Sequence, residues 1–375
     1  MSHGTSVGRR KISGALPKFL VVLVVLLSGA AAAVDKESIE ALIEAEHWKR
    51  ARALIEPLFR ANPGEPRANF LMACCYEAAG EYNRALALAE KAVAIEPKNA
   101  DYHLLLAFIC GRQAMRAGIL RQIGLALRIR REAETALGLN PNHVEARIVL
   151  AEYFFRAPGI FGGDKNKARA LAEEVVKLNP ALGYLEQASL ARRERKQDRM
   201  EDLYKKAVEA NAQSYRALMA LAGFYSYGSQ SNFDLAEKYA REAIKLDPGR
   251  SGAYGLLAQN SARQERWQEL DDILGQAEKN VPDNLNPYFQ AGRTVLQDKK
   301  DPGRAERYFR KYLTQEPEPT SASPAQAYWR LGQALERQNR KAEAVEAITT
   351  ALKLDPGLDS AKKDLKRLRS NVFLD

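Results

Sequence analysis

The hydrophobic and polar positions along the chain repeat in units of about 34 residues, and most units close on a proline. The closing residues are Pro63, Pro97, Pro141, Pro180, Ala212, Pro248, Pro282, Pro317 and Pro356. Ala212 is included because the 68-residue interval between Pro180 and Pro248 holds two units, the first without its proline. A 34-residue period is that of a paired-helix repeat, and proline cannot continue a helix, so the pattern predicts nine helical hairpins.

One position of each unit is always small. The closing residue is counted as position 32, with allowance for insertions in the third and fourth units. Position 8 is then Ala73, Ala107, Ala151, Ala188, Ala222, Ala258, Gly292 and Gly332. Positions 20 and 27 are each alanine in six units. Small residues at fixed points let the two helices of a hairpin approach closely, which predicts an all-α fold.

Large aromatic residues occupy position 4 in several units, as at Tyr184, Tyr254, Tyr288 and Tyr328. The segment 69–99 has the most complete set of matching residues: Ala73, Tyr76, Gly80, Tyr82, Ala85, Ala92 and Pro97. These residues resemble the tetratricopeptide repeat (TPR) family. The resemblance covers residues 35–357 and implies a right-handed superhelical α-solenoid of about nine TPR-like hairpins in 34–357. Residues 358–375 are expected to form a capping helix and tail.

The N-terminal 33 residues have the order of a secretory signal peptide. Arg9, Arg10, Lys11 and Lys18 precede an apolar run over 19–27, and small residues follow up to Ala33. The run is shorter than the roughly 20 residues of a membrane-spanning helix, so we expect cleavage before Val34. The chain is then expected to be exported to the periplasm. An uncleaved segment that anchors it to the inner membrane, facing the periplasm, is the alternative.

The charge of the chain argues against a nucleic-acid partner. The formal net charge is +10, and removal of the signal segment takes four basic and no acidic residues, which leaves +6. Such a weakly basic, exported chain is not expected to bind nucleic acid.

The interval from Pro97 to Pro141 is ten residues longer than the period, which places an insertion of about ten residues in the third unit, within a segment 112–131 that is rich in arginine and free of acidic residues. Apolar residues alternate with the arginines, so we expect lengthened helices with a basic, amphipathic face. Arg121, Arg128, Arg130 and Arg131 would then either contact a membrane surface or an acidic partner, or form a solvated face whose apolar side packs on the next hairpin.

The loop 156–165 in the fourth unit is five residues longer than the repeat requires and carries Ile160 and Phe161 between turn-forming residues. Loops that outgrow a repeat often carry specificity, so these two residues are expected to form a second interaction surface. The long arginine-bearing hairpin followed by this Ala-Pro-Gly-Ile-Phe-Gly-Gly loop resembles a subtype of exported bacterial TPR proteins.

The sequence offers no pattern of a catalytic or metal site. His47, His103 and His143 lie in separate units, without a second histidine or a cysteine pair at ligand spacing. We therefore expect a non-enzymatic protein with no catalytic residues, no metal and no cofactor. An enzyme built from residues on several helices remains an alternative.

The resemblance to TPR proteins implies a partner-binding groove along the first helices of the units. Position 13 supplies a row of arginines, and positions 5 and 9 supply aromatic residues and one more arginine. The expected groove residues are Phe70, Phe108, Arg112, Arg156, Arg193, Arg263, Phe289, Arg293, Trp329 and Arg337. Because a guanidinium group forms bidentate hydrogen bonds with a carboxylate, this row of arginines favours binding of an acidic segment. The alternative is that the arginines only make the protein more soluble.

These observations together predict a protein-binding scaffold of the bacterial cell envelope that holds an extended or helical segment of a partner protein or peptide. Two other functions stay open: a membrane-surface adaptor anchored by an uncleaved N-terminus, and an accessory subunit of an envelope polysaccharide or secretion system. The oligomeric state has no signal in the sequence.

Overall fold

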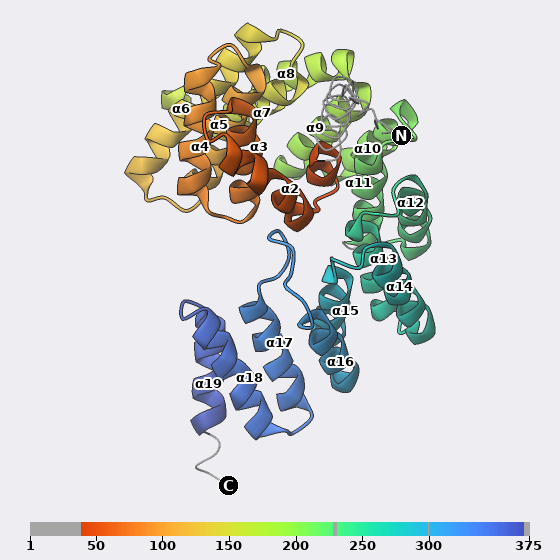
Figure 1. Cartoon of the computed structure of the whole chain (residues 1–375). Helices are drawn as coiled ribbons and strands as arrows, with labels where there is room; N and C mark the ends of the chain where they lie inside the picture. The colour runs from red at the N-terminus through yellow and green to blue at the C-terminus, as the bar shows by residue number, and fades with distance from the viewer. Residues whose placement is uncertain (1–38, 228–230, 299, 371–375) are drawn as a thin grey trace, which may run out of the picture.

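Paired helices follow one another through residues 39–227, 231–298 and 300–370, which are the residues that this computed structural model describes (Figure 1). The expected signal peptide, residues 1–33, lies outside them. A short helix over residues 39–44 is the first member of the first pair. The first helices of the following pairs are α3 (Pro66–Ala78), α5 (Ala100–Ala114), α7 (Val144–Arg156), α9 (Pro180–Arg193), α11 (Tyr215–Ser226), α13 (Ser251–Arg263), α15 (Asn286–Gln297) and α17 (Pro324–Arg337).

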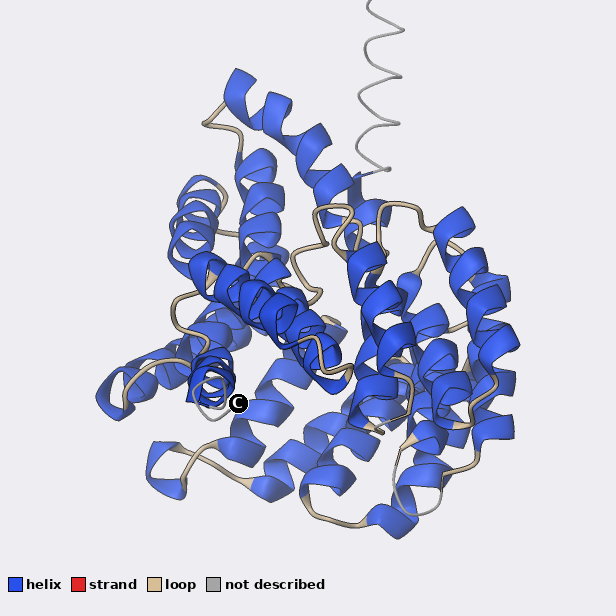
Figure 2. Ribbon diagram, turned by 90° about the horizontal axis from the view of Figure 1, so that it is seen from below, coloured by secondary structure: helices blue, strands red, loops and turns tan. Residues whose placement is uncertain are grey.

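Each of these helices is followed by its partner. The second helices are α2 (Trp48–Ala61), α4 (Tyr82–Ile95), α6 (Ile119–Leu139), α8 (Lys165–Leu178), α10 (Met200–Ala210), α12 (Phe233–Leu246), α14 (Trp267–Asn280), α16 (Pro302–Tyr312) and α18 (Lys341–Leu354). A last helix, α19 (Asp359–Ser370), covers the end of the array, and its Leu368 is buried. The described residues hold no strand (Figure 2), and the predicted TPR-like superhelical solenoid is confirmed.

The interior of each hairpin is built around the small residues of position 8. The six alanines of this set are all buried. A Cβ added to Gly292 would lie 3.0 Å from the Phe309 ring, and one added to Gly332 would overlap Ile348 Cγ1. The two helices of a hairpin therefore approach so closely that no larger side chain fits between them.

The turn inside several hairpins uses a left-handed backbone at position 15. Gly80 has φ 73°, but the same turn is made by Glu46 (φ 65°), Arg195 (61°), Glu265 (57°) and Asn339 (60°). A side chain in this conformation costs free energy that glycine avoids, so three of these turns carry backbone strain and the asparagine turn carries less.

The third hairpin is longer than the others, although not in the way that we predicted. α6 has 21 residues, whereas α5 has 15, so almost all of the extra length lies in the second helix. None of the described helices combines the length and the apolar character that a membrane crossing requires.

The solenoid curves until its beginning meets its later units. The loop between α16 and α17 reaches toward α2 in Figure 1, and the backbone N–H of Lys49 donates a hydrogen bond to Glu318 Oε2 (3.1 Å) across 269 residues of chain. This contact closes one side of the superhelix.

Candidate binding groove

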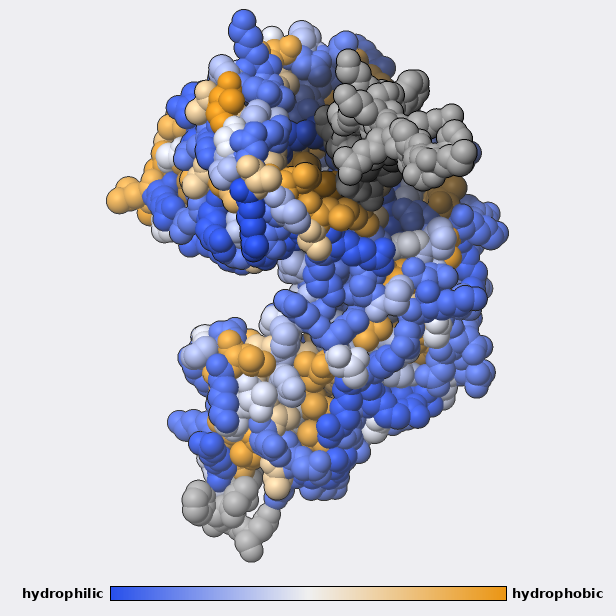
Figure 3. All heavy atoms as spheres, viewed as in Figure 1, coloured by the Kyte–Doolittle hydropathy of each residue, from blue (hydrophilic) through white to orange (hydrophobic). Residues whose placement is uncertain are grey.

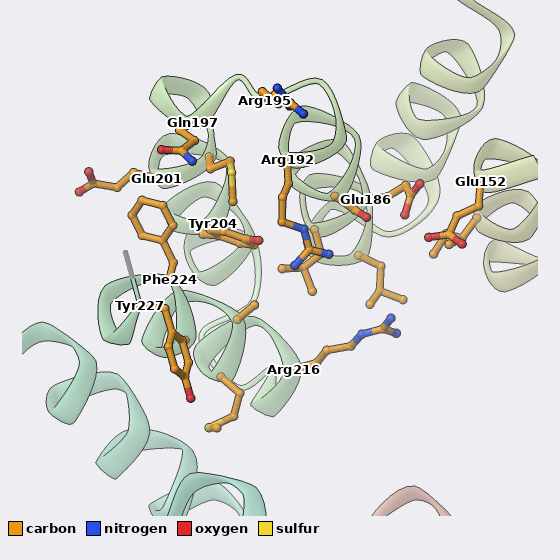
Figure 4. Close-up of a pocket in the computed structure, with 18 of the residues that line it drawn as sticks. Glu152, Glu186, Arg192, Arg195, Gln197, Glu201, Tyr204, Arg216, Phe224 and Tyr227 are labelled. Atoms are coloured by element: carbon orange, nitrogen blue, oxygen red, sulfur yellow. The ribbon is translucent and has the colours of Figure 1, made fainter. Parts of the chain in front are cut away.

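An open groove of about 960 Å³ runs along the inner surface across the first helices of four consecutive units, α5, α7, α9 and α11. The turn and second helix of the fifth unit, around Met200 and Tyr204, complete one wall. Figure 4 shows the side chains that line the groove, and Figure 3 shows that hydrophobic residues also gather at the surface around α2.

The floor of the groove is apolar. It is formed by Phe108, Ile148, Val149, Leu182, Leu185, Met219, Ala220 and Phe224. Phe108, which the sequence analysis expected in a groove, is 47% exposed although it lies on the inner side of the array. Exposed aromatic and methionine side chains in a concavity are typical of surfaces that bind apolar side chains of a partner.

Two arginines line the groove from neighbouring helices. Arg192 on α9 points into the space between Tyr204 and Glu186, whereas Arg216 on α11 extends away from Tyr204, toward the side of the groove that holds Glu186 and Glu152 (Figure 4). Neither guanidinium makes an ion pair or hydrogen bond with any residue that the structure describes. Their charges are therefore available to a ligand.

Most acidic residues of the groove already have partners. Glu152 pairs with Arg193 (2.7 Å). Glu201 accepts hydrogen bonds from Lys205 (2.8 Å) and from the Tyr225 hydroxyl (2.8 Å). The free charge of the groove is therefore mainly positive.

Glu186 is a buried carboxyl on α9 at the edge of the groove. Burial, with the nearby Glu152, raises the pKa of Glu186 to about 8. Its Oε1 is buried and has no hydrogen-bond partner among the described residues. At neutral pH this side chain is mostly a neutral acid, which can donate a hydrogen bond. Sequence reasoning missed Glu186 because it occupies position 6, which is not among the groove positions of the repeat.

The predicted arginine row makes contacts within the solenoid. In four cases the guanidinium reaches back to the first helix of the preceding unit. Arg112 pairs with Glu77 (2.8 Å), Arg193 with Glu152, and Arg263 and Arg337 donate to the backbone carbonyls of Ser226 and Leu296. Arg156 is exposed, and Arg293 has a buried Nε without a hydrogen-bond partner. The role of this row in partner binding stays a prediction, and four of its members also link successive units.

Three of the predicted aromatic groove residues pack inside the protein. Phe70 stacks on Tyr102 with ring centroids 5.0 Å apart, and Phe289 is buried against Phe309 and Tyr312. The Trp329 indole N–H donates to Asp364 of α19 (2.8 Å). Of the ten predicted groove residues, Phe108 alone lines the groove described above.

The insertion in the third unit has two parts: a stretch of α6 whose arginines form ion pairs, and an exposed apolar tip at the start of α6. Arg128 pairs with Glu90 (2.6 Å), Arg130 with Glu134 (2.8 Å), and Arg131 with Glu132 (3.1 Å). Arg121 is exposed near the tip, where Ile119 and Leu120 are 75% and 85% exposed.

In the loop of the fourth unit, the two apolar residues differ. Ile160 is fully in solvent, whereas Phe161 is half-buried and its carbonyl accepts a hydrogen bond from the Tyr153 hydroxyl (2.6 Å). Both tip and loop thus present isolated apolar side chains, and their roles stay predictions.

A second polar cluster lies where the solenoid closes on itself. His47 begins α2, Asp283 lies in the loop before α15, and Glu318 in the loop before α17. Arg50 hydrogen-bonds to Asp283 Oδ1, and the Lys49 ammonium donates to the backbone carbonyls of Asp283 (2.8 Å) and Glu316 (2.5 Å). Burial raises the pKa of Glu318 to about 7. We call these five residues, His47, Lys49, Arg50, Asp283 and Glu318, the clasp.

Comparison with known proteins supports the repeats. Family models described as tetratricopeptide repeat match residues 42–109, 215–250 and 294–359, so the chain contains TPRs in these segments. A pentatricopeptide repeat-containing protein of Arabidopsis thaliana, At1g09190, is 34% identical over 73 residues, which are 20% of this chain and 14% of that protein.

Several solved structures are similar in architecture. The chain aligns with yeast Tom70 at 15% identity and a TM-score of 0.46, over 92% of this chain and 89% of the other. It aligns with human IFIT1, solved as a dimer with m7Gppp-AAAA, at 17% identity and a TM-score of 0.49, over 86% of this chain and 78% of the IFIT1 chain. TTC0263, a TPR protein of Thermus thermophilus, aligns at 18% identity and a TM-score of 0.40, over 52% of this chain and 98% of the TTC0263 chain.

Proposed function

We propose that this protein is a non-enzymatic scaffold that binds a segment of another protein in the groove across α5, α7, α9 and α11. The observation that carries the proposal is the combination of an apolar floor with two unpaired arginines, Arg192 and Arg216, on a concave surface. A TPR-like solenoid supplies such a surface because its first helices line the inner side, as in other repeat arrays.

The proposed occupant carries apolar side chains and at least one carboxylate. Its apolar side chains would cover Phe108, Leu185 and Phe224, and its carboxylate would lie between the two guanidiniums. An arginine pair in a partly apolar site binds a carboxylate more strongly than it would in bulk water, because the competing solvent is displaced. Either an extended segment or one face of a helix supplies these groups at suitable spacing.

Glu186 adds a second means of recognition. As a neutral acid with an unpartnered oxygen, it would donate a hydrogen bond to a backbone carbonyl of the bound segment. Ionisation above about pH 8 would replace this donor by a negative charge beside the carboxylate of the ligand. Binding is therefore expected to weaken as the pH rises through that value.

We place the scaffold in the bacterial cell envelope because of the signal-like N-terminus. Basic residues, an apolar run of about nine residues and Ala31-x-Ala33 precede Val34. Mass spectrometry of the exported protein tests this part: a mature chain that starts near Val34 supports export with cleavage, and a retained segment supports the membrane-anchored form. A place as an accessory subunit of an envelope polysaccharide or secretion system is compatible with the same groove.

A selection of random dodecapeptides on the immobilised protein tests the groove. We expect the enriched peptides to combine large apolar residues with aspartate or glutamate. The double substitution Arg192→Glu and Arg216→Glu should weaken their binding about 100-fold, since two charge-assisted contacts would be lost.

The matched control is the substitution of Arg307 and Lys353 by glutamate, which changes the net charge equally on exposed positions of α16 and α18. This variant should bind as the unaltered protein does. Enriched peptides without carboxylates, or equal binding by the groove variant, would overturn the proposal.

The tip of the third hairpin favours a second candidate function, contact with a membrane surface. Ile119 and Leu120 protrude into solvent, and Arg116 and Arg121 flank them, which is the composition of an interfacial anchor. Sedimentation with vesicles that contain anionic lipid tests this candidate. Retention that is lost on substitution of Ile119 and Leu120 by serine supports it, and retention that is unchanged, or absent from the start, removes it.

A further inference from the structure

The clasp brings together three donor atoms from segments that are far apart in the sequence. A ring nitrogen of His47, a carboxylate oxygen of Asp283 and one of Glu318 all lie within 4.8 Å of one another. His47 belongs to the first unit, whereas Asp283 and Glu318 directly follow the closing prolines of the seventh and eighth units. The two carboxylates thus occupy equivalent positions of successive repeats.

This pair is peculiar to the clasp. The other closing residues are followed by Gly64, Lys98, Asn142, Ala181, Gln213, Gly249 and Gly357, none of which is acidic. The repeat itself therefore does not require a carboxylate here. Both acids lie in loops that contact the first hairpin, as does the loop after the sixth unit, where Arg250 pairs with Glu44 (3.1 Å).

The donor atoms are buried and make no hydrogen bond. His47 is 5% exposed and Glu318 is 1% exposed. His47 Nδ1, Asp283 Oδ2 and Glu318 Oε1 each lack a hydrogen-bond partner among the described residues, although His47 Nδ1 lies within ion-pair distance of Asp283 Oδ2 (3.4 Å). A buried polar atom with no partner costs roughly 1–3 kcal/mol, so three in one place indicate a missing ligand.

The neighbouring contacts leave these three atoms free. Arg50 binds the other oxygen of Asp283, Oδ1, and the backbone N–H of Lys49 binds the other oxygen of Glu318, Oε2. The Lys49 ammonium is turned to backbone carbonyls rather than to the donor atoms. The outer contacts thus orient each ligand, as second contacts commonly do in metal sites.

We propose that the clasp is a zinc site formed by His47 Nδ1, Asp283 Oδ2 and Glu318 Oε1, with water completing the coordination. His47 Nδ1 and Asp283 Oδ2 are 3.4 Å apart, and donors about 2.05 Å from a tetrahedral zinc ion are separated by about 3.3 Å. Glu318 lies within 4.8 Å of both and has to move closer to complete the set. An imidazole nitrogen with two carboxylates suits Zn²⁺ better than Ca²⁺ or Mg²⁺, which prefer oxygen alone.

The charges of the clasp set a limit on this site. The two carboxylates neutralise a divalent cation, whereas Lys49 and Arg50 repel it. Affinity is therefore lower than at a site that lacks such cations, and bound zinc would act mainly by fastening the first hairpin to the seventh and eighth units. This inference is independent of the groove, whose residues lie on other helices.

Titration calorimetry of the untagged full-length protein, stripped of metal with EDTA, tests the site with ZnCl₂ as the probe. We expect one zinc ion to bind per chain. Co²⁺ in its place should give an absorption spectrum of nitrogen and oxygen ligands without a sulfur-to-metal band. That spectrum distinguishes the clasp from Cys74, Cys75 and Cys110 and needs no variant.

The variants His47→Gln and Glu318→Gln should each weaken zinc affinity about 10-fold or more, because each removes one of three protein ligands. His143→Gln and Glu316→Gln are the matched controls, a buried histidine of another unit and an exposed glutamate of the Glu318 loop. Both should bind zinc as the unaltered protein does. Absence of zinc binding, a sulfur band with Co²⁺, or equal affinity in all four variants would overturn the proposal.

Discussion

The interior of each hairpin and the inner surface of the superhelix differ in how their contacts are made. Inside a hairpin, Gly332 packs against Ile348, a residue only 16 positions away, and the same small position recurs in unit after unit. On the inner surface, contacts join the first hairpin to late units, as between Lys49 and Glu318 across 269 residues and between Glu44 and Arg250 across 206. The first kind of contact stabilises the units, and the second fixes the shape and chemistry of the whole.

This difference explains where polar residues are tolerated. Small apolar residues fill the hairpins because close helix packing leaves no room for anything else. Buried carboxyls lie at Glu186 and Glu318, where several units meet, and at Glu132 inside the third hairpin, where it hydrogen-bonds with His103 (2.7 Å). The buried carboxyl inside a hairpin thus has a partner in the same hairpin, whereas Glu186 and Glu318 each keep one oxygen without a hydrogen-bond partner among the described residues.

The largest expected effect is inside a hairpin. Gly332→Ala should destabilise the protein by about 3 kcal/mol, because the new methyl group overlaps Ile348 and a close-packed hairpin cannot open without loss of contacts. Hydrogen exchange of α17 and α18 should show the loss directly.

The matched control for this substitution is Gly275→Ala on α14. A Cβ there meets nothing within 4 Å, so the change should stabilise the helix by up to about 1 kcal/mol. Equal effects of the two substitutions would contradict the close packing of position 8.

The second prediction concerns pH and the groove. Because the folded pKa of Glu186 is raised to about 8 from an ordinary value of 4.5, folding holds a proton that the unfolded chain releases. The stability linked to this group is full below pH 4.5 and is lost as the pH rises through 8. Glu186→Gln replaces the titrating carboxyl by a neutral amide and so removes this pH-dependent loss of stability. The variant should therefore be more stable than the unaltered protein at pH 9 by about 2 kcal/mol.

Urea denaturation at pH 5 and at pH 9 measures this change. The gain from Glu186→Gln should be several times larger at pH 9 than at pH 5. Glu173→Gln, at an exposed position of the neighbouring α8, should give no such difference. A gain that is the same at both pH values would show that Glu186 is ionised in the folded protein throughout.

The third prediction concerns the clasp without metal. In EDTA, Asp283→Asn should weaken the contact with Arg50 and His47 by about 1 kcal/mol, since a partly exposed ion pair is lost. Hydrogen exchange of residues 39–61 should speed up roughly five-fold, a local effect of that size. The exchange rates in α17 and α18 should stay the same. Faster exchange in all units would instead mean that the clasp and the hairpins unfold as one cooperative unit.

The smallest expected effect is at a turn. Glu265→Gly should stabilise the protein by about 0.5 kcal/mol, because glycine adopts φ 57° without strain while a weak surface pair with Lys300 is lost. Gly80→Ala, at the equivalent turn, should destabilise by about 1 kcal/mol. Thermal denaturation measures both changes. Melting temperatures that shift in the same direction in the two variants would contradict backbone strain at Glu265.

The fold was largely predictable because every hairpin repeats its evidence. The position 8 residues, from Ala73 to Gly332, gave eight independent signs of the same close approach. The residue type fits a left-handed turn at Gly80 and Asn339, whereas Glu46, Arg195 and Glu265 give no sign of positive φ. Strain of this kind is imposed by the packed helices on either side and leaves no trace in the local sequence.

The inner surface was predicted only in part. Phe108 was expected in a groove because repeat positions place it there, whereas Glu186 stands at position 6, which is not a groove position. Arg192 and Arg216 stand at positions 12 and 2, which face the groove in TPR proteins, but the expected set did not include them. The clasp could not be predicted from one sequence. Whether His47 meets Asp283 depends on the curvature summed over seven hairpins. The small rotation between neighbouring hairpins cannot be predicted from the sequence of any single unit.

The clasp also changes how the molecule would respond to a pulling force. An open solenoid extends like a spring, because each unit tilts a little on the next. Here α2 is fastened to the loops that precede α15 and α17, so tension applied at the two ends would pass through the clasp and bypass the helices from α3 to α14. The groove lies within that bypassed stretch and would keep its shape under load until the clasp gives way.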